Sequence, residues 1–229
     1  MWWFGGLHAN LMAGWRGRAA PASVRLLDAG CGTGGFLARV AAAAPGAALF
    51  GVELDREACR LARDKSGATV AVADVNALPF AERSFDVIVS ADVLCHRGVE
   101  EHSALAGFRR CLRPGGVLVL NLPAYRWLYS AHDVAVDNAR RYDRKELLAL
   151  LREAGFARPE ARYWNAFLFP LMLLRRKLLR RRSVQSEVAL LPAAVERLFA
   201  ACLALERGLV ATGIKLPFGG SILAIAVRE

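Results

Sequence analysis

LLDAGCGTGG, residues 26–35, is the stretch that decides the fold of this chain. An apolar run ends at Asp28, glycines occupy positions 30, 32, 34 and 35, and the helical pattern FLARVAAAA follows at residues 36–44. Glycine lets a backbone turn tightly and approach a ligand closely, and the N-terminus of a helix presents free N–H groups. The stretch therefore predicts a strand, a ligand-binding turn and a helix.

Two kinds of ligand fit this turn. Gly30, Gly32 and Gly35 match the G-x-G-x-x-G pattern of dinucleotide-binding proteins, and Glu53 stands where an acid could hold a ribose. That pattern favours a nucleotide-dependent oxidoreductase. The carboxylate of Asp28, in contrast, would repel a pyrophosphate and attract a cationic amino-acid group. Taken alone, the turn leaves both ligands open.

Short apolar runs alternate with helical patterns over residues 24–122. Such alternation builds a parallel sheet with helices on both faces. The predicted strands cover 24–30, 48–54, 68–74, 84–90 and 116–122, and the predicted helices cover 36–44, 56–65 and 102–112. Further along, a helix is predicted over 144–156 and strands over 157–164 and 221–227, with helical residues between these strands.

Five motifs occur in order: LLDAGCGTG, GVEL, ADVNALPF, SFDVIVSADVLCH and LRPGG. Together they resemble the class I methyltransferases that use S-adenosylmethionine (SAM), over roughly residues 24–156. The resemblance implies an α/β, Rossmann-like sheet of seven strands in the order 3-2-1-4-5-7-6, with strand 7 antiparallel. It also implies a single domain over 1–229, SAM as the cofactor and S-adenosylhomocysteine as its product.

The resemblance further implies that SAM lies across the C-terminal ends of strands 1 to 4, as the switch-point rule expects. The methionine part would face Asp28 and residues 30–34, the ribose would face Glu53, and the adenine would face Asp74. The implied cofactor-binding residues are Asp28, Gly30, Cys31, Gly32, Gly34, Glu53, Leu54, Asp74, Val75, Ser90 and Ala91. Cys31 fits a small filler of the loop better than a nucleophile, and no metal is implied.

Methyl transfer from a sulfonium is an in-line displacement, so the enzyme mainly holds nucleophile and methyl group in line. An oxygen or ring-nitrogen nucleophile often also needs a general base. Candidate catalytic residues are His96, His132 and Tyr125. Aromatic and basic side chains after the fifth strand would suit an apolar or planar acceptor with an anionic group, namely Trp127, Tyr129, Arg140, Arg141 and Tyr142. Structural roles are the alternative for His96 and for residues 140–142, which would then tie this loop to the next helix.

WLYSAHD, ARRYDRKELLALLREAGF, RYWNAFLFPLMLLRR and LPFGGSILAIAVR are similar to a bacterial subgroup of these methyltransferases with mostly unassigned acceptors. Trp2, Trp3 and Phe4 fit that subgroup, which implies a lid over residues 1–20. The subgroup often has His where this chain has Asp137 or Asn138, so a base in this loop stays open. NLPAY, residues 121–125, looks like the N-P-P-Y motif of nitrogen methyltransferases, but it follows strand 5 instead of strand 4. Adenine and amide acceptors are therefore disfavoured.

YWNAFLFPLMLLRRKLLRRR, residues 163–182, runs from apolar to basic and opens a predicted helical insertion over 166–213. Its apolar part reaches about 18 Å as a helix, short of the roughly 30 Å of a hydrocarbon core, so no membrane span is expected. An imperfect amphipathic helix with a basic face could lie on an anionic membrane through residues 166–182. The alternative is a helix packed on its own domain.

The net charge is +10, and six of the basic residues lie within 175–182. The basicity is therefore local and does not indicate a nucleic-acid partner. Five scattered cysteines without a C-x-x-C pair argue against zinc and disulfides and suit the cytoplasm. We expect a SAM-dependent methyltransferase acting on a small-molecule or lipid-like acceptor. A nucleotide-dependent oxidoreductase, a nucleic-acid methyltransferase and a non-catalytic SAM-binding module are the alternatives, and the oligomeric state stays open.

Overall fold

The structure, a computed structural model, describes residues 1–17, 23–178 and 191–229, with the backbone alone for 175–178. A seven-stranded sheet in the order β3-β2-β1-β4-β5-β7-β6 forms its centre. The strands are β1 (Arg25–Ala29), β2 (Ala48–Glu53), β3 (Thr69–Val72), β4 (Phe85–Ala91), β5 (Leu112–Pro123), β6 (Ala157–Trp164) and β7 (Ser221–Val227). β7 runs antiparallel to both of its neighbours, whereas the pairs among β1 to β5 are parallel. The predicted strand order and the antiparallel strand 7 are confirmed.

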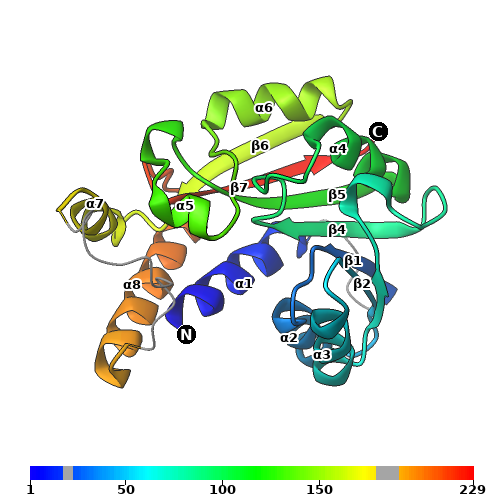
Figure 1. The fold of residues 1–229 in the computed structure, drawn as a ribbon, viewed down its shortest axis with the longest axis horizontal. Helices are drawn as coiled ribbons and strands as arrows, with labels where there is room; N and C mark the ends of the chain where they lie inside the picture. Colours follow the sequence, from blue (N-terminus) through cyan, green and yellow to red (C-terminus); the bar gives the residue numbers. More distant parts are fainter. Residues whose placement is uncertain (18–22, 179–190) are drawn as a thin grey trace.

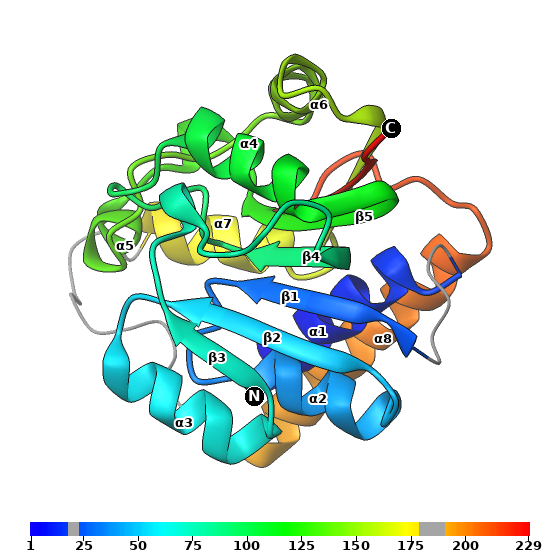
Figure 2. The same ribbon diagram turned by 90° about the vertical axis from the view of Figure 1, so that its right-hand side faces the viewer.

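Helices cover both faces of this sheet (Figures 1 and 2). α4 (Glu101–Cys111) and α6 (Arg144–Glu153) lie on one face, and α1 (Trp2–Trp15), α2 (Gly35–Ala43), α3 (Arg56–Ser66) and α8 (Ala193–Ala211) lie on the other. Alternate residues of β4 serve the two layers: Ile88 packs under α4 and α6, while Val87 and Val89 pack on the opposite side. Burial on both faces explains why these strands read as continuous apolar runs.

Short elements complete the chain: the 3-10 helices η2 (Val75–Ala77) and η3 (Arg126–Leu128), and the helix α5 (Ala131–Ala135). β5 begins four residues before the predicted position 116, because Leu112 already pairs with Phe85 ahead of a register shift in the β4–β5 ladder. The consequence is local, and the C-terminal ends of the parallel strands still meet at one edge of the sheet.

α1 is a structural layer over most of its length. Leu11 and Trp15 are fully buried against the sheet. Gly6 lets the helix approach α8 closely, because a Cβ there would lie 2.4 Å from Leu203. The first two turns of α1 reach the edge of the sheet where the strands end: Trp2, Trp3 and Phe4 line the cavity there, and His8 packs on Phe36.

Two helices lie between β6 and β7: α7 (Phe169–Leu178) and α8. The buried carboxylate of Glu206 in α8 accepts hydrogen bonds from the backbone N–H groups of Asn165, Ala166 and Phe167, at 2.5, 2.6 and 3.2 Å. This contact fixes α8 to the chain that leaves β6. None of the helices in the described part of the chain has the length and apolar content that a membrane span requires. The predicted basic face lies outside the described side chains.

Candidate cofactor and acceptor site

The glycine turn follows β1 and lies against two neighbouring strands. Gly30 and Cys31 donate their backbone N–H groups to the carbonyl of Val52 in β2, at 2.9 and 3.0 Å. A Cβ on Gly30 would lie 2.3 Å from Val93, directly after β4, and Gly30 has a φ of 85°. Gly32 has open space where its Cβ would stand. A ligand can therefore approach the backbone of the turn at Gly32, whereas Gly30 is packed tightly against Val93.

Asp28 is a buried carboxyl group at the end of β1, with 4% of its surface exposed. No described residue donates a hydrogen bond to it. Burial, and then the negative charge of Glu53, raises the pKa of Asp28 to about 7. A buried carboxylate without a partner gains most from a ligand that brings N–H donors or a positive charge.

Glu53 ends β2 and connects it to the turn. One of its oxygens accepts the N–H of Gly32 at 3.0 Å, and the other accepts the N–H of Leu54 at 2.8 Å. Leu54 is 65% exposed beside it, a free apolar side chain next to a carboxylate. This pair suits a ribose with an adjoining base. Asp55 caps α3 by accepting the N–H of Ala58 at 2.7 Å, a structural role.

The remaining residues of the implied SAM site have structural contacts of their own. Asp74 accepts the N–H of Asn76 at 2.9 Å and so caps η2, with Val75 buried behind it. Ser90 is buried and donates its hydroxyl to the carbonyl of Ala29 at 2.8 Å, which ties β4 to β1. Cys31 is buried, and burial raises the pKa of its thiol, which fits a filler of the loop. All these residues nonetheless lie at the C-terminal ends of β1 to β4.

These observations fit SAM. The unpartnered Asp28 can receive the cationic amino group of a methionine moiety, and the backbone at Gly32 leaves room for it. Glu53 presents a carboxylate to vicinal hydroxyls one strand away.

A cavity of about 400 Å³ opens beside this edge. The first turn of α1, the loops after β4 and β5, the start of β7, and residues of α7 and α8 form its walls. Of the predicted acceptor-side residues, His96, His132 and Arg141 line it. Trp2, Trp3 and Phe4 from the predicted lid also contribute to its lining.

Five predicted residues lie away from this lining: Tyr125, Trp127, Tyr129, Arg140 and Tyr142. Tyr142 is buried, and its hydroxyl lies 2.9 Å from the carbonyl of Leu94 and 2.5 Å from a carboxylate oxygen of Glu101, while Arg140 pairs with Glu101 at 2.9 Å. These contacts tie the loop to α4. Tyr125 stacks on Tyr163 with ring centroids 5.2 Å apart, and burial raises the pKa of Tyr125 to about 12.

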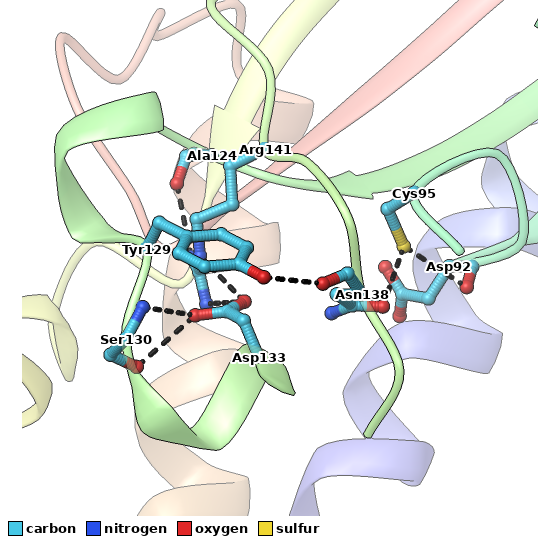
Figure 3. Close-up of polar contacts among 8 residues, drawn as sticks. All are labelled: Asp92, Cys95, Ala124, Tyr129, Ser130, Asp133, Asn138 and Arg141. Carbon is cyan, nitrogen blue, oxygen red and sulfur yellow. Dashed lines mark hydrogen bonds and ion pairs between the residues drawn. The ribbon is translucent and has the colours of Figure 1, made fainter. Parts of the chain in front are cut away.

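Arg141 is held by a buried ion pair (Figure 3). It contacts the carboxylate of Asp133 through two nitrogens, each at 2.8 Å, and donates to the carbonyl of Ala124 at 3.1 Å. Asp133 also accepts the N–H and hydroxyl of Ser130, at 2.9 and 3.1 Å. The guanidinium is thus oriented before any ligand arrives. One face of this polar cluster borders the cavity.

Asp92 is a cavity residue that sequence reasoning missed. It stands directly after β4 with a φ of 55°, and it accepts a hydrogen bond from the side-chain amide of Asn121 at 3.0 Å. Burial raises the pKa of Asp92 to about 7, although the bond from Asn121 and the charge of Arg141 lower it. The sequence signal for Asp92 is a charged residue at the end of an apolar strand.

Comparison with known proteins gives a consistent picture. A family model described as "Methyltransferase domain" matches residues 27–120. A malonyl-[acyl-carrier protein] O-methyltransferase from Geobacter sulfurreducens is 32% identical over 148 residues, covering 58% of this chain and 55% of that protein. The ubiquinone/menaquinone biosynthesis C-methyltransferase UbiE from Paracoccus denitrificans is 28% identical over 171 residues, covering 60% of this chain and 68% of that protein. The chain spans about half the length of several of the curated relatives it matches.

Solved structures share the whole fold. The geranyl diphosphate C-methyltransferase from Streptomyces coelicolor A3(2), in complex with Mg²⁺, geranyl diphosphate and S-adenosyl-L-homocysteine, aligns with a TM-score of 0.66 at 18% identity. The alignment covers 97% of this chain and 80% of that chain. The predicted fold is confirmed, and solved structures that share it include complexes with SAM and with S-adenosylhomocysteine. Over residues 27–120 the chain thus matches a methyltransferase domain, and its fold is that of the class I, SAM-dependent methyltransferases it resembles.

Proposed function

We propose that this protein transfers the methyl group of SAM to a small-molecule or lipid-like acceptor bound in the cavity. One observation carries the proposal: Val93 packs against Gly30 of the cofactor turn, and the residue before it, Asp92, lines the cavity. The two sites therefore meet where β1 and β4 end side by side. A methyl donor in one and an acceptor in the other would lie in contact.

In this mechanism SAM supplies an electrophilic methyl group on a sulfonium. The protein's own contribution is mainly to hold the two reactants in line, which can supply about 7–11 kcal/mol of the barrier. Asp28 and Glu53 would fix the two ends of the cofactor. The apolar walls of the cavity would exclude water from the reacting atoms.

The named acceptors of similar proteins support an acceptor of this class. They include malonyl-[acyl-carrier protein] and 24-methylenesterol among sequence relatives, and geranyl diphosphate among structural neighbours. The dinucleotide alternative is less favoured, because Asp28 carries no neutralising partner among the described residues and would face a pyrophosphate.

Two further roles belong to the same proposal. The first turn of α1 would act as the lid, since Trp2, Trp3 and Phe4 line the cavity. Peripheral contact with a membrane would use α7, where Leu171 and Leu174 are 50% and 55% exposed just before the basic run. Flotation with anionic liposomes tests this contact, and recovery of the protein in the lipid-free fraction alone would reject it.

Calorimetry with SAM and, in parallel, with NADH tests the cofactor. Saturable binding of SAM and none of NADH is the expected result. Incubation with methyl-labelled SAM and candidate acceptors, followed by mass spectrometry, then identifies the product. Binding of SAM without transfer of the labelled methyl group to any acceptor would instead support a non-catalytic SAM-binding module.

A further inference from the structure

We propose that Asp92 receives the proton that the acceptor loses, and that the acceptor is an amphiphile with a phenol-like hydroxyl. This inference rests on the proposed methyltransferase function. In the step, the acceptor's O–H bond breaks and its proton moves to a carboxylate oxygen of Asp92. The acceptor oxygen forms a bond to the methyl carbon while the carbon–sulfur bond of SAM breaks, and that electron pair stays on sulfur. Asp92 later returns its proton to water.

The first step of the argument is the place of Asp92. It borders the cavity directly after β4, and its neighbour Val93 packs on Gly30 of the cofactor turn. Its left-handed backbone, with a φ of 55°, is uncommon for a residue other than glycine. Its own backbone N–H donates to the carbonyl of Asn121 at 2.8 Å, which holds this conformation.

The second step is the orientation of the carboxyl group. The indole N–H of Trp164 donates to the side-chain carbonyl of Asn121 at 2.7 Å, so the amide nitrogen of Asn121 faces Oδ1 of Asp92. Trp164 is fixed in turn by stacking on Trp3, with ring centroids 4.8 Å apart. No described residue donates a hydrogen bond to the other oxygen, Oδ2. Oδ1 of Asp92 is thereby held by Asn121, and Oδ2 is available to accept a hydrogen bond from an acceptor molecule.

The third step is the proton affinity of the group. The titratable or charged groups that share the cavity with Asp92 or interact with it are Cys95, His96, His132, Asp133, Arg141, Glu196 and the amino group of Met1. Asp133 is paired with Arg141, and Glu196 with the amino group of Met1. Burial outweighs the bond from Asn121 and the charge of Arg141, so the pKa of Asp92 is raised to about 7. Such a base can take a proton from a phenol, whose pKa is about 10, far more readily than from an aliphatic alcohol. It can also release that proton near neutral pH.

The fourth step is the apolar part of the cavity. Trp3, Leu168, Met172 and Phe199 contribute apolar side chains to its lining. Phe4 and Leu171 also line it and are 45% and 50% exposed, so the apolar wall continues to the surface. This distribution suits a molecule whose hydroxyl points inward and whose apolar body points outward.

The test uses 4-octylphenol and its methyl ether 4-octylanisole as probes, added to the protein saturated with S-adenosylhomocysteine. Calorimetry should show that 4-octylphenol binds about tenfold or more tightly than 4-octylanisole, because only the phenol donates a hydrogen bond to Asp92. Asp92→Asn should remove this preference. With SAM present, the wild type should methylate 4-octylphenol, and Asp92→Asn should lower kcat/KM by about 10²–10⁴-fold. The matched control is Asp64→Asn on the exposed face of α3, which should behave as the wild type.

The pH dependence of the reaction distinguishes a catalytic role of Asp92 from a purely structural one. With SAM saturating, so that the protonation of Asp28 does not limit the rate, the pH profile of kcat/KM for 4-octylphenol should rise to a plateau with an inflection near pH 7 in the wild type and lose that inflection in Asp92→Asn. Trp164→Phe frees the amide of Asn121 to turn its oxygen toward Asp92, so the inflection should move to higher pH. Three results would overturn the assignment while SAM still binds: equal affinity for both probes, wild-type methylation by Asp92→Asn, or no interaction with 4-octylphenol. Absence of SAM binding in the wild type would instead reject the proposed function itself.

Discussion

The negative charge of Glu53, at the end of β2, adds to burial in raising the pKa of Asp28, at the end of β1, to about 7. Glu53 itself has hydrogen bonds to the backbone of Gly32 and Leu54, whereas Asp28 has none from any described residue. The two carboxyl groups at the cofactor edge are therefore unequal: one is satisfied by its own chain, and the other is left for a ligand.

The affinity for SAM should depend on pH because of this inequality. A cationic amino group needs the ionised form of Asp28, and the free protein protonates Asp28 as the pH falls through about 7. We expect the dissociation constant to be flat above pH 8 and to rise by up to about tenfold per pH unit between pH 7 and pH 5. Calorimetry in buffers of equal ionic strength measures it. A constant affinity over this range would contradict the role of Asp28.

Asp28→Asn should stabilise the free protein at high pH while abolishing SAM binding. A folded-state pKa raised above the ordinary value means that stability is lost as the pH rises from about 4 to about 7. The amide cannot ionise, so the variant should gain on the order of 1–3 kcal/mol at pH 8 and almost nothing at pH 4. Urea unfolding at both pH values tests this. Equal stability of the two proteins at pH 8 would show that Asp28 is solvated after all.

The strands of the sheet could be predicted from the sequence, because each buried strand is a short apolar run and the turns between elements are marked by residues such as glycine and proline. The order of the strands came from the resemblance of five motifs, since spacing alone does not say which strand pairs with which. Asp92 was missed for a related reason. Its partner Asn121 lies 29 positions away, and Trp164 lies 43 positions beyond that, so no local pattern connects them.

The arginines after β5 show a second limit of sequence reading. Their composition suited an anionic group of the acceptor equally well as a structural tie. The structure pairs Arg141 with the buried Asp133 and Arg140 with Glu101. A charged side chain can bind an acceptor or form a structural ion pair. The choice depends on partners that are distant in the sequence and that only the fold brings together.

Gly30→Ala should destabilise the protein more than Gly67→Ala. Both glycines have a positive φ, 85° and 67°, so both variants carry backbone strain of about 1–2 kcal/mol. Only at Gly30 would the new Cβ also meet a neighbour, Val93, at 2.3 Å, which adds about 1–3 kcal/mol of overpacking. Chemical denaturation measures the difference. Equal losses would mean that the junction between the turn and β4 is loosely packed.

Glu206→Ala should loosen the insertion. It removes the carboxylate that accepts three backbone N–H groups after β6, and each unsatisfied group costs about 1–3 kcal/mol. Hydrogen exchange should become faster at residues 165–167 and in α8, with a lower midpoint of thermal unfolding. Glu153→Ala, at an exposed position in α6, is the matched control and should leave both unchanged. Unaltered exchange in Glu206→Ala would show that α8 is held by other contacts.

The central claim is that Asp28, Glu53 and the glycine turn bind SAM. The most direct measurement is calorimetric titration of SAM into the wild type and into Asp28→Asn at pH 8, with NADH as the competing ligand. The account predicts one site per chain with a dissociation constant on the micromolar scale, no detectable heat with Asp28→Asn, and none with NADH. Undiminished SAM binding by Asp28→Asn, or saturable binding of NADH with no binding of SAM, would contradict it.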